Sequence, residues 1–311
     1  MAWLNPKSTE HIKVIRSFPG DDNERKVPSL VAKTLLPHGK RKWGFRCANE
    51  TPEIETWRFL KMCLDPEFHA SCIKRGLTWV PRDKGEVHSL VTYYLGELYS
   101  HIRGYISDAN GWTTESWDEK GIEFAFSVPT TWEEPAILDS FKGIIHAAGF
   151  GTCRAHEIVL SLTEPEAAAV AYMCGPGRAT TLQPGDVFLT VDAGGGTTDL
   201  ALSKVVGVEP LHLDQVHQVQ GTGIGSMQID LAFQRLVKER LRRHPEMADQ
   251  LPANLDMKLA QSLSYRTRKH NLGRAEQDQE DDSYTIEIPG VHFSFTCEEL
   301  GIRHGHLVVA R

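Results

Sequence analysis

Apolar residues recur at three- and four-residue steps in several parts of the chain, which is the spacing of amphipathic helices. The longest run covers residues 85–106, and another covers residues 225–243. Within residues 51–78 the segment TWRFLKMCL has a shorter pattern of the same kind. The pattern therefore predicts a long helix in each of the first two segments and a shorter helix in the third.

Two further helices are predicted from the spacing of a capping box, in which a Glu three residues after a Thr satisfies a backbone N–H at the helix start. Thr131 and Glu134 precede an apolar face that ends at Gly149. Thr163 and Glu166 open a second such helix in TEPEAAAVAYMCG. We expect both helices to begin at these residues.

Alternation of apolar and polar residues predicts strands elsewhere. IEFAFSV at 122–128 alternates cleanly, VFLTVDA and DLALSKVV flank a run of glycines, and WGFRC, EIVLSL and YTIEI are predicted to be shorter strands. The polar segments SDANGWTTESWDEKG (107–121) and EQDQEDD (276–282) are predicted to be loops. Strands mixed with helices predict an α/β protein with layered sheets.

Length and composition narrow the class of protein further. A chain of 311 residues is long for one simple core, so two domains or lobes are expected. A net charge of −7 argues against a nucleic-acid or anionic-membrane partner, and no apolar run approaches the ~18 residues that a membrane span needs. The six cysteines are scattered without a CxxC pair, which is typical of free thiols in a reducing compartment. The cytoplasm is therefore the predicted location.

One stretch, VDAGGGTTDLAL at 191–202, carries more chemistry than a turn needs. It places three consecutive glycines between Asp192 and Asp199, with Thr197 and Thr198 beside them. An ordinary hairpin needs only one or two residues able to adopt positive φ. No GxxxxGK[ST] loop occurs, and a strand follows the glycines where a dinucleotide fingerprint has a helix. The alternative to a binding site is a hairpin turn that carries these extra polar residues and binds no ligand.

The residue types in this stretch fit a magnesium-bound phosphate. Successive glycines let backbone N–H groups converge on an anion and let the backbone approach it closely. A carboxylate such as Asp192 at the end of a strand is costly to bury without a partner, and Mg²⁺ commonly takes one or two carboxylates plus phosphate oxygens. Thr197 and Thr198 could hydrogen-bond phosphate oxygens, and Asp199 could orient metal-bound water.

Several segments together resemble the nucleotide-binding domain of the seventy-kilodalton heat-shock protein family, within the actin-like ATPase superfamily. VDAGGGTTDLAL resembles that family's second phosphate-binding hairpin, FAFSVPTTWEEPAILDSFKGIIHAAGF its strand–proline–helix segment, and LTEPEAAAVAY its lobe-connecting helix. GEVHSLVTYYLGELYSHIRGYI and GIGSMQIDLAF follow the same correspondence, in the same order along nearly the whole chain. KVPS, WGF and YTIEIPG resemble the divergent branch of the family.

The resemblance implies roles for the residues of the hairpin. Asp192 would hold magnesium through water and help to position the attacking water. Gly194, Gly195 and Gly196 would surround the β- and γ-phosphates, Thr197 would contact the γ-phosphate, and Thr198 would lie in the same site. Asp199 would support a cation. The implied cofactors are ATP or ADP with Mg²⁺.

The resemblance also implies roles outside the hairpin. Glu164 would face the metal from the connecting helix, together with Asp192 and Thr197 in the catalytic group. Gly223 and Gly225 would contribute to the nucleotide site. Lys61 falls near the family's catalytic lysine, and a solvated helix lysine is the alternative reading of that residue.

The implied architecture is an incomplete, two-lobed, ribonuclease-H-like α/β fold. The first lobe would cover residues 1–185, with core pieces at about 1–25 and 121–185 and an inserted subdomain at about 26–120. The second lobe would cover residues 186–311, with an insertion from about residue 223. The implied function is magnesium-dependent ATP binding and hydrolysis linked to client or co-chaperone proteins; a non-hydrolysing nucleotide sensor and an inactive fragment are the alternatives.

The chain also departs from the family. The helix segment QSLSYRTRKHNLG has Arg266, Arg268 and Lys269 but no matching acid, and Ile137 stands where the family has a relay arginine. No D-x-G-T motif precedes Asp192, and the only consecutive glycines are 194–196. Half of the phosphate site and the adenosine turn are therefore expected to be missing, and phosphoryl transfer needs groups on several sides of the γ-phosphate. We expect that this chain does not turn over ATP.

Overall fold

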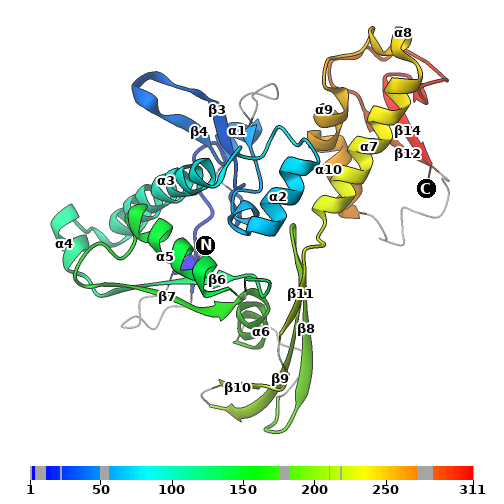
Figure 1. The fold of residues 1–311 in the computed structure, drawn as a ribbon. Coiled ribbons are helices and arrows are strands. Elements are labelled where there is room, and N and C mark those ends of the chain that lie inside the picture. The colour runs from blue at the N-terminus through cyan, green and yellow to red at the C-terminus, as the bar shows by residue number, and fades with distance from the viewer. Residues whose placement is uncertain are drawn as a thin grey trace. The chain divides into compact units, whose positions relative to one another are not determined.

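Among the residues that the computed structural model describes, helices are combined with five β-sheets (Figure 1). The described residues are 2–3, 12–21, 23–49, 56–132, 134–174, 182–209, 211–217, 219–271 and 283–310. The chain divides into two units, residues 1–224 and 225–311, each with its own internal packing. This boundary lies close to residue 223, where the sequence predicts an insertion to begin; the predicted two-lobe division stays a prediction. The acidic segment 276–282 lies outside the described residues.

The first part of unit 1 contains short strands and helices. A three-stranded antiparallel sheet has the order β4-β3-β5, and β1 pairs with β2. The elements are β1 (Ala2–Trp3), β2 (Lys13–Val14), β3 (Val31–Leu35), the 3-10 turn η1 (Pro37–Gly39), β4 (Arg41–Trp43), α1 (Phe45–Asn49), β5 (Thr56–Trp57), η2 (Met62–Leu64) and α2 (Pro66–Lys74).

Two predictions for this region were wrong. WGFRC is not a strand, because β4 ends at Trp43, Gly44 turns the chain at φ 59°, and α1 begins at Phe45. TWRFLKMCL is not a helix, because Phe59 has φ 53° and separates β5 from η2. The half-buried Phe59 packs on the buried Trp79 with ring centroids 4.9 Å apart, so this aromatic contact and not helical periodicity decides the backbone here.

The long helix α3 (Lys84–Asn110) confirms the prediction for residues 85–106 and continues beyond it. Asp83 caps its first turn by accepting a hydrogen bond from the Glu86 N–H at 2.9 Å, and Gly111 ends it at φ 65°. The predicted loop 107–121 also contains α4 (Thr114–Glu119). Trp117 of α4 is fully buried and donates from Nε1 to the Tyr99 hydroxyl at 3.1 Å, which explains why a polar segment is helical.

A parallel strand pair with two helices follows. It comprises β6 (Ile122–Val128), α5 (Pro135–Ala147), β7 (His156–Thr163) and α6 (Glu164–Cys174). The capping box at Thr163 is confirmed, since its N–H and hydroxyl donate to Glu166 Oε2 at 2.9 and 2.6 Å. The capping box at Thr131 is wrong, because α5 begins at Pro135 with Glu134 as its N-cap and no side-chain cap bond.

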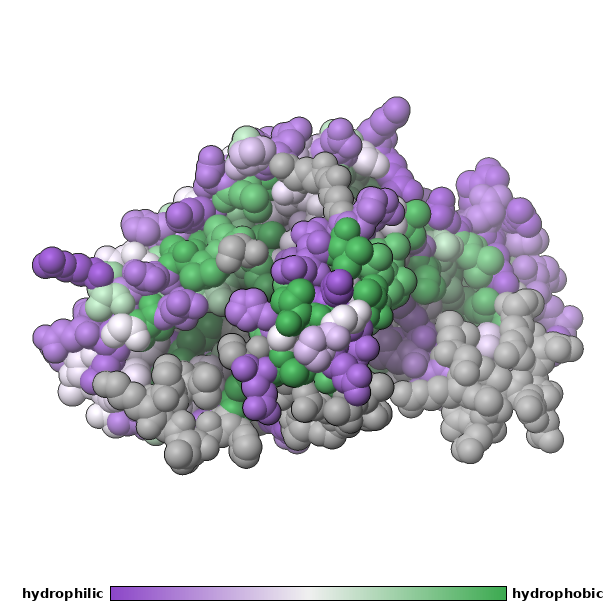
Figure 2. Space-filling view, turned by 90° about the horizontal axis from the view of Figure 1, so that it is seen from below, coloured by the Kyte–Doolittle hydropathy of each residue, from purple (hydrophilic) through white to green (hydrophobic). Residues whose placement is uncertain are grey.

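A four-stranded antiparallel sheet carries the glycine hairpin (Figure 1). The strands are β8 (Val187–Ala193), β9 (Thr198–Val208), β10 (Leu211–Gln215) and β11 (Gln220–Thr222). Residues 198–200 of β9 pair with both β8 and β11, so these two strands lie on opposite sides of β9. The predicted strands VFLTVDA and DLALSKVV are confirmed. Alternate residues of β8, including Val187, Leu189 and Val191, are exposed, and Figure 2 shows apolar residues among polar ones on the face seen from below.

Unit 2 consists of helices and a small antiparallel sheet of order β12-β14-β13. Its core includes the fully buried Leu259, Leu300 and Ile302, and Phe233 of α7 stacks on Tyr265 of α10 at 4.3 Å. The predicted helix at 225–243 and the strand YTIEI are confirmed. The elements are α7 (Met227–Arg243), α8 (Pro245–Ala248), α9 (Leu255–Gln261), α10 (Leu263–Asn271), β12 (Ser283–Glu287), β13 (Ile302–Arg303) and β14 (His306–Ala310).

The described residues therefore form a mixed α/β structure, as the sequence predicts. None of the described helices combines the length and the hydropathy that a transmembrane span requires.

Candidate functional site

The glycine hairpin brings its two flanking acids face to face. β8 ends at Ala193 and β9 begins at Thr198, and the Gly194 N–H donates to the Thr197 carbonyl at 2.9 Å across the turn. Asp192 pairs with Asp199 in the strand register. Directly opposed residues of neighbouring strands share one face of a sheet, and like charges there repel unless a cation or a hydrogen-bond donor intervenes. The hairpin thus places its two acidic residues opposite each other on one face of the sheet.

The three glycines of the turn provide space rather than an unusual backbone. All three are described, and none of them has a positive φ. A Cβ atom on Gly196 would lie 2.5 Å from Met62 Sδ, so no side chain fits there while Met62 packs on the hairpin. A Cβ on Gly195 would meet no atom within 4 Å. Gly196 therefore serves the contact with η2, and Gly195 faces open space where a ligand could approach.

Asp199 is the most deeply buried residue of the candidate site, with 1% of its surface exposed. Its Oδ1 accepts hydrogen bonds from both the N–H of Thr130, at 3.0 Å, and the Thr130 hydroxyl. Its Oδ2 is buried and has no hydrogen-bond partner among the described residues. A buried carboxylate oxygen without a partner is costly, which favours a cation or an ordered water at this atom.

Gly221 of β11 makes this arrangement possible. It pairs with Asp199 in the strand register, on the side of β9 opposite β8. A Cβ atom on Gly221 would overlap the Thr130 hydroxyl oxygen and would lie 2.8 Å from Asp199 Oδ1. The sequence prediction did not include Thr130 or Gly221. The signal for Thr130 was a hydroxyl residue directly after a strand and a proline.

Lys61 and Glu164 form the second part of the site. The Lys61 ammonium pairs with Glu164 Oε1, donates to the Ser127 carbonyl at 3.3 Å and lies 5.7 Å from the centre of the Trp132 ring. Lys61 directly precedes η2, and Glu164 is the first residue of α6. The sequence predicted both residues separately, and the structure brings them together. Lys61 is therefore a paired lysine and not an isolated one.

The remaining predicted site residues lie in different surroundings, and they do not all belong to the same unit. Thr197 is buried, and the Thr198 hydroxyl donates to the Ile224 carbonyl at 2.7 Å. Gly223 belongs to unit 1 and has open space where a Cβ would be. Gly225 is the first residue of unit 2, whereas the hairpin belongs to unit 1.

The basic helix of unit 2 has an acidic partner that the sequence did not reveal. Lys269 of α10 donates to Asp230 Oδ1 at 2.7 Å and to the Ser226 carbonyl at 2.9 Å. The Tyr265 hydroxyl donates to the same Asp230 oxygen at 2.9 Å. Burial, and then the adjacent Asp230, raise the pKa of Tyr265. The acid was missed because it lies on α7, 39 residues before Lys269.

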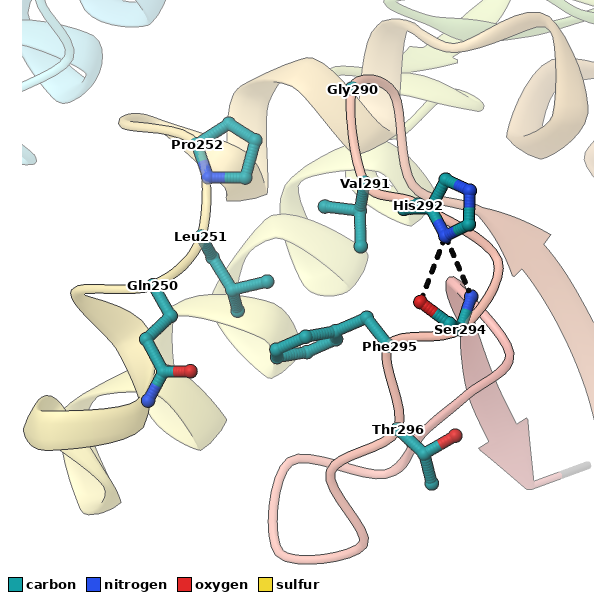
Figure 3. Close-up of a pocket in the computed structure, with 9 residues that line it drawn as sticks. All are labelled: Gln250, Leu251, Pro252, Gly290, Val291, His292, Ser294, Phe295 and Thr296. Carbon is teal, nitrogen blue, oxygen red and sulfur yellow. Dashed lines mark hydrogen bonds between the residues drawn. The ribbon is translucent and has the colours of Figure 1, made fainter.

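Unit 2 also contains an open cavity of about 610 Å³ (Figure 3). Leu251, Val291 and Phe295 form an apolar wall, and Figure 3 shows His292 with its Nδ1 directed at Ser294. That Nδ1 accepts from the Ser294 N–H at 3.2 Å and lies 2.8 Å from the Ser294 hydroxyl oxygen. The described residues of the lining include no Lys, Arg, Asp or Glu, so their chemistry does not match a phosphate or a divalent cation.

Comparisons with known proteins give a distant similarity. No protein-family model matches the chain. The chain is 22% identical over 297 residues to heat shock 70 kDa protein 12A of Mus musculus and, equally, to that of Homo sapiens. Each match covers 76% of this chain and 43% of the relative, so the chain spans less than half the length of these proteins. The similarity agrees with the resemblance in the motifs and does not by itself assign the chain to the family.

Proposed function

We propose that this chain binds a magnesium–nucleotide complex, ATP or ADP, at the hairpin of residues 192–199, in a two-lobed actin-like fold of the seventy-kilodalton heat-shock protein type. The observation that carries the proposal is the strand-register pairing of Asp192 with Asp199, in a hairpin that Met62, the neighbour of Lys61 in the Lys61–Glu164 ion pair, contacts at Gly196. Hydrogen bonds and packing connect these groups, because Thr130 contacts Asp199 while Met62 packs on Gly196 and directly follows Lys61.

The residues present fit Mg²⁺. Two carboxylates on one sheet face supply hard oxygen ligands, and Mg²⁺ is typically bound by one or two carboxylates together with waters and phosphate oxygens. The buried Oδ2 of Asp199 lacks a partner among the described residues. Asp192 and Asp199 would hold the ion, Asp192 through water. When bound, Mg²⁺ would neutralise charge on the phosphate oxygens.

The residues of this chain would act mainly by position and charge. Lys61 would offer a cation to the phosphates, with Glu164 fixing its direction. The open face of Gly195 would let the backbone approach a phosphate, and Thr197 would add a hydroxyl. Catalysis of phosphoryl transfer depends on such positioning and on electrostatic stabilisation. The sequence predicts that the bound nucleotide is not turned over, which corresponds to a non-hydrolysing nucleotide sensor, and hydrolysis of the family type is the alternative.

The organisation and partners are proposed on the same basis. The lobes would be residues 1–185 and 186–311, with Gly223 and Gly225 at the opening of an inserted subdomain that corresponds to unit 2. The relatives are named as heat-shock proteins, and by analogy a client or co-chaperone protein would be the partner in the cytoplasm.

Isothermal titration calorimetry with ATP tests the proposal. We expect binding in the presence of Mg²⁺ and at least about tenfold weaker binding in excess EDTA, a change of about 1.4 kcal/mol. Equal heats in both conditions, or none in either, would refute a magnesium–nucleotide site. Single-turnover hydrolysis then separates an ATPase from a nucleotide sensor.

A further inference from the structure

Thr130 follows the strand β6 and contacts Asp199 on a different strand, β9. It lies in the turn after β6, and 69 residues separate it from Asp199. The N–H and the hydroxyl of this one residue both donate to the same oxygen, Oδ1. Two donors on one oxygen fix the direction of a carboxylate, because rotation of the group would break both bonds. The second oxygen is therefore held in a defined place.

The surroundings leave Asp199 little freedom to adopt another arrangement. The residue is 1% exposed, so water cannot replace a lost donor easily. Gly221 lies against Thr130 and Asp199, and only the absence of a Cβ leaves room for the two bonds. Hydrogen bonds to charged groups are stronger than those between neutral groups. Thr130 is thus the main polar contact that determines where Oδ1 points.

The turn that contains Thr130 is itself anchored on the other side of the site. Trp132, two residues later, is buried and packs edge-on against Phe141 at 5.2 Å. The same indole ring lies under the Lys61 ammonium. One short turn therefore contacts both the aspartate of the hairpin and the lysine of the Lys61–Glu164 pair.

We propose that Thr130 is a positioning residue, which holds Asp199 by its hydroxyl and N–H so that Oδ2 is presented to the magnesium–nucleotide site. The proposal rests on the proposed function of the hairpin. Thr130 does not itself contact the metal or the phosphate. Loss of its hydroxyl should change the magnesium dependence of nucleotide binding, which a role in stability alone would not do.

The test compares Thr130→Val with Thr130→Ser in the full 311-residue chain. Valine keeps the shape and the backbone N–H but removes the hydroxyl, whereas serine restores the hydroxyl. We expect Thr130→Val to weaken Mg-ATP binding about tenfold and to raise the Mg²⁺ concentration needed for half-maximal binding. Thr130→Ser should stay within about twofold of the parent. Thr131→Val is the matched control, because Thr131 contributes a methyl group beside Gly221 and no bond to Asp199 is found for it.

Gly221→Ala is a second, independent perturbation. Its added methyl group would displace the Thr130 hydroxyl, so it should weaken Mg-ATP binding to the same extent as Thr130→Val. The double variant should be no weaker than Gly221→Ala alone, since both changes break one contact. Gly121→Ala is the control, because a Cβ at Gly121 meets nothing within 4 Å.

An exchange measurement without nucleotide separates the two proposals. The Thr130 amide should be protected from hydrogen exchange in the parent and should exchange at least about tenfold faster in Asp199→Ala, which removes its acceptor. If the parent binds no ATP, the proposed function is wrong, and the exchange rate of the Thr130 amide alone tests the contact between Thr130 and Asp199. Parent-like ATP binding by Thr130→Val, an equal loss in Thr131→Val, or an unprotected Thr130 amide in the parent would overturn the role of Thr130.

Discussion

Lys61 and Glu164 form an ion pair although 103 residues separate them in the sequence. The side chains are 36% and 26% exposed, so the pair is partly solvated. A pair of this kind contributes little to stability, typically less than about 1 kcal/mol. Its geometry suits a different purpose, because Glu164 and the Ser127 carbonyl hold the Lys61 ammonium in one place.

Lys61→Gln should therefore separate binding from stability. We expect the free energy of unfolding to fall by less than about 1 kcal/mol, because the ion pair is solvated. Nucleotide affinity should fall about tenfold, because a cation is lost beside the phosphates. Urea unfolding and calorimetry measure the two effects. Lys74→Gln, on the exposed surface of α2, is the control and should change neither. Unchanged affinity in Lys61→Gln would assign Lys61 a structural role only.

Substitution of Gly196 should affect stability, whereas substitution of Gly195 should affect phosphate binding. Gly196→Val introduces a side chain where Met62 Sδ lies, so it should destabilise the fold by about 1–3 kcal/mol. A simultaneous Met62→Ala change should recover part of that loss. A Cβ at Gly195 meets no neighbouring atom, so Gly195→Val should leave stability nearly unchanged while it blocks phosphate binding. Thermal unfolding and ATP titration check both expectations. Normal ATP binding by Gly195→Val would show that the hairpin is only a turn.

Cys63 should make stability depend on pH in the alkaline range. Burial, and to a lesser degree the neighbouring Cys72, raise the pKa of Cys63 from 9.0 to about 12. A raised pKa means that the folded state favours the neutral thiol. The contribution of the neutral thiol to the free energy of unfolding is therefore complete below pH 9. It is lost progressively as the pH rises from about 9 towards 12, because the unfolded chain then releases its proton more readily.

The measurement is urea unfolding between pH 8 and pH 11 for the parent and for Cys63→Ala. Removal of the thiol should reduce the fall in the free energy of unfolding as the pH rises. This holds even if lost packing makes the variant less stable at every pH. Tyr94 has its pKa raised to about 12 by burial and stays present in both proteins, so the difference between the two curves isolates Cys63. Identical slopes would contradict this assignment.

Periodicity predicted the elements whose faces differ clearly in polarity. The helix α3, the helix α7 and the strands β6, β8 and β9 follow from such patterns. The errors arose where the packing of a few aromatic residues decides the backbone. Trp117 makes α4 helical within a polar segment, and Phe59 interrupts TWRFLKMCL through its contact with Trp79. These choices depend on tertiary packing, which spacing along the chain does not record.

The candidate site was predictable to the extent that its residues are adjacent in sequence. Asp192 and Asp199 flank the glycines, and the antiparallel register places them opposite each other. Thr130, Gly221 and Met62 could not be found in this way, because each contacts the hairpin through a fold that joins distant segments. The acid that pairs with Lys269 was missed for the same reason, since Asp230 lies on another helix.

The magnesium dependence of ATP affinity in Asp192→Asn is the decisive measurement for the proposed magnesium–nucleotide site. Asparagine keeps the size of the side chain and removes its charge, so the fold should remain intact while the advantage of Mg²⁺ over EDTA disappears. Asp214→Asn, an exposed acid on β10 of the same sheet, is the matched control and should behave like the parent. We expect Mg²⁺-dependent ATP binding in the parent and in Asp214→Asn, and none of that dependence in Asp192→Asn. The same magnesium dependence in all three proteins would show that Asp192 does not hold magnesium.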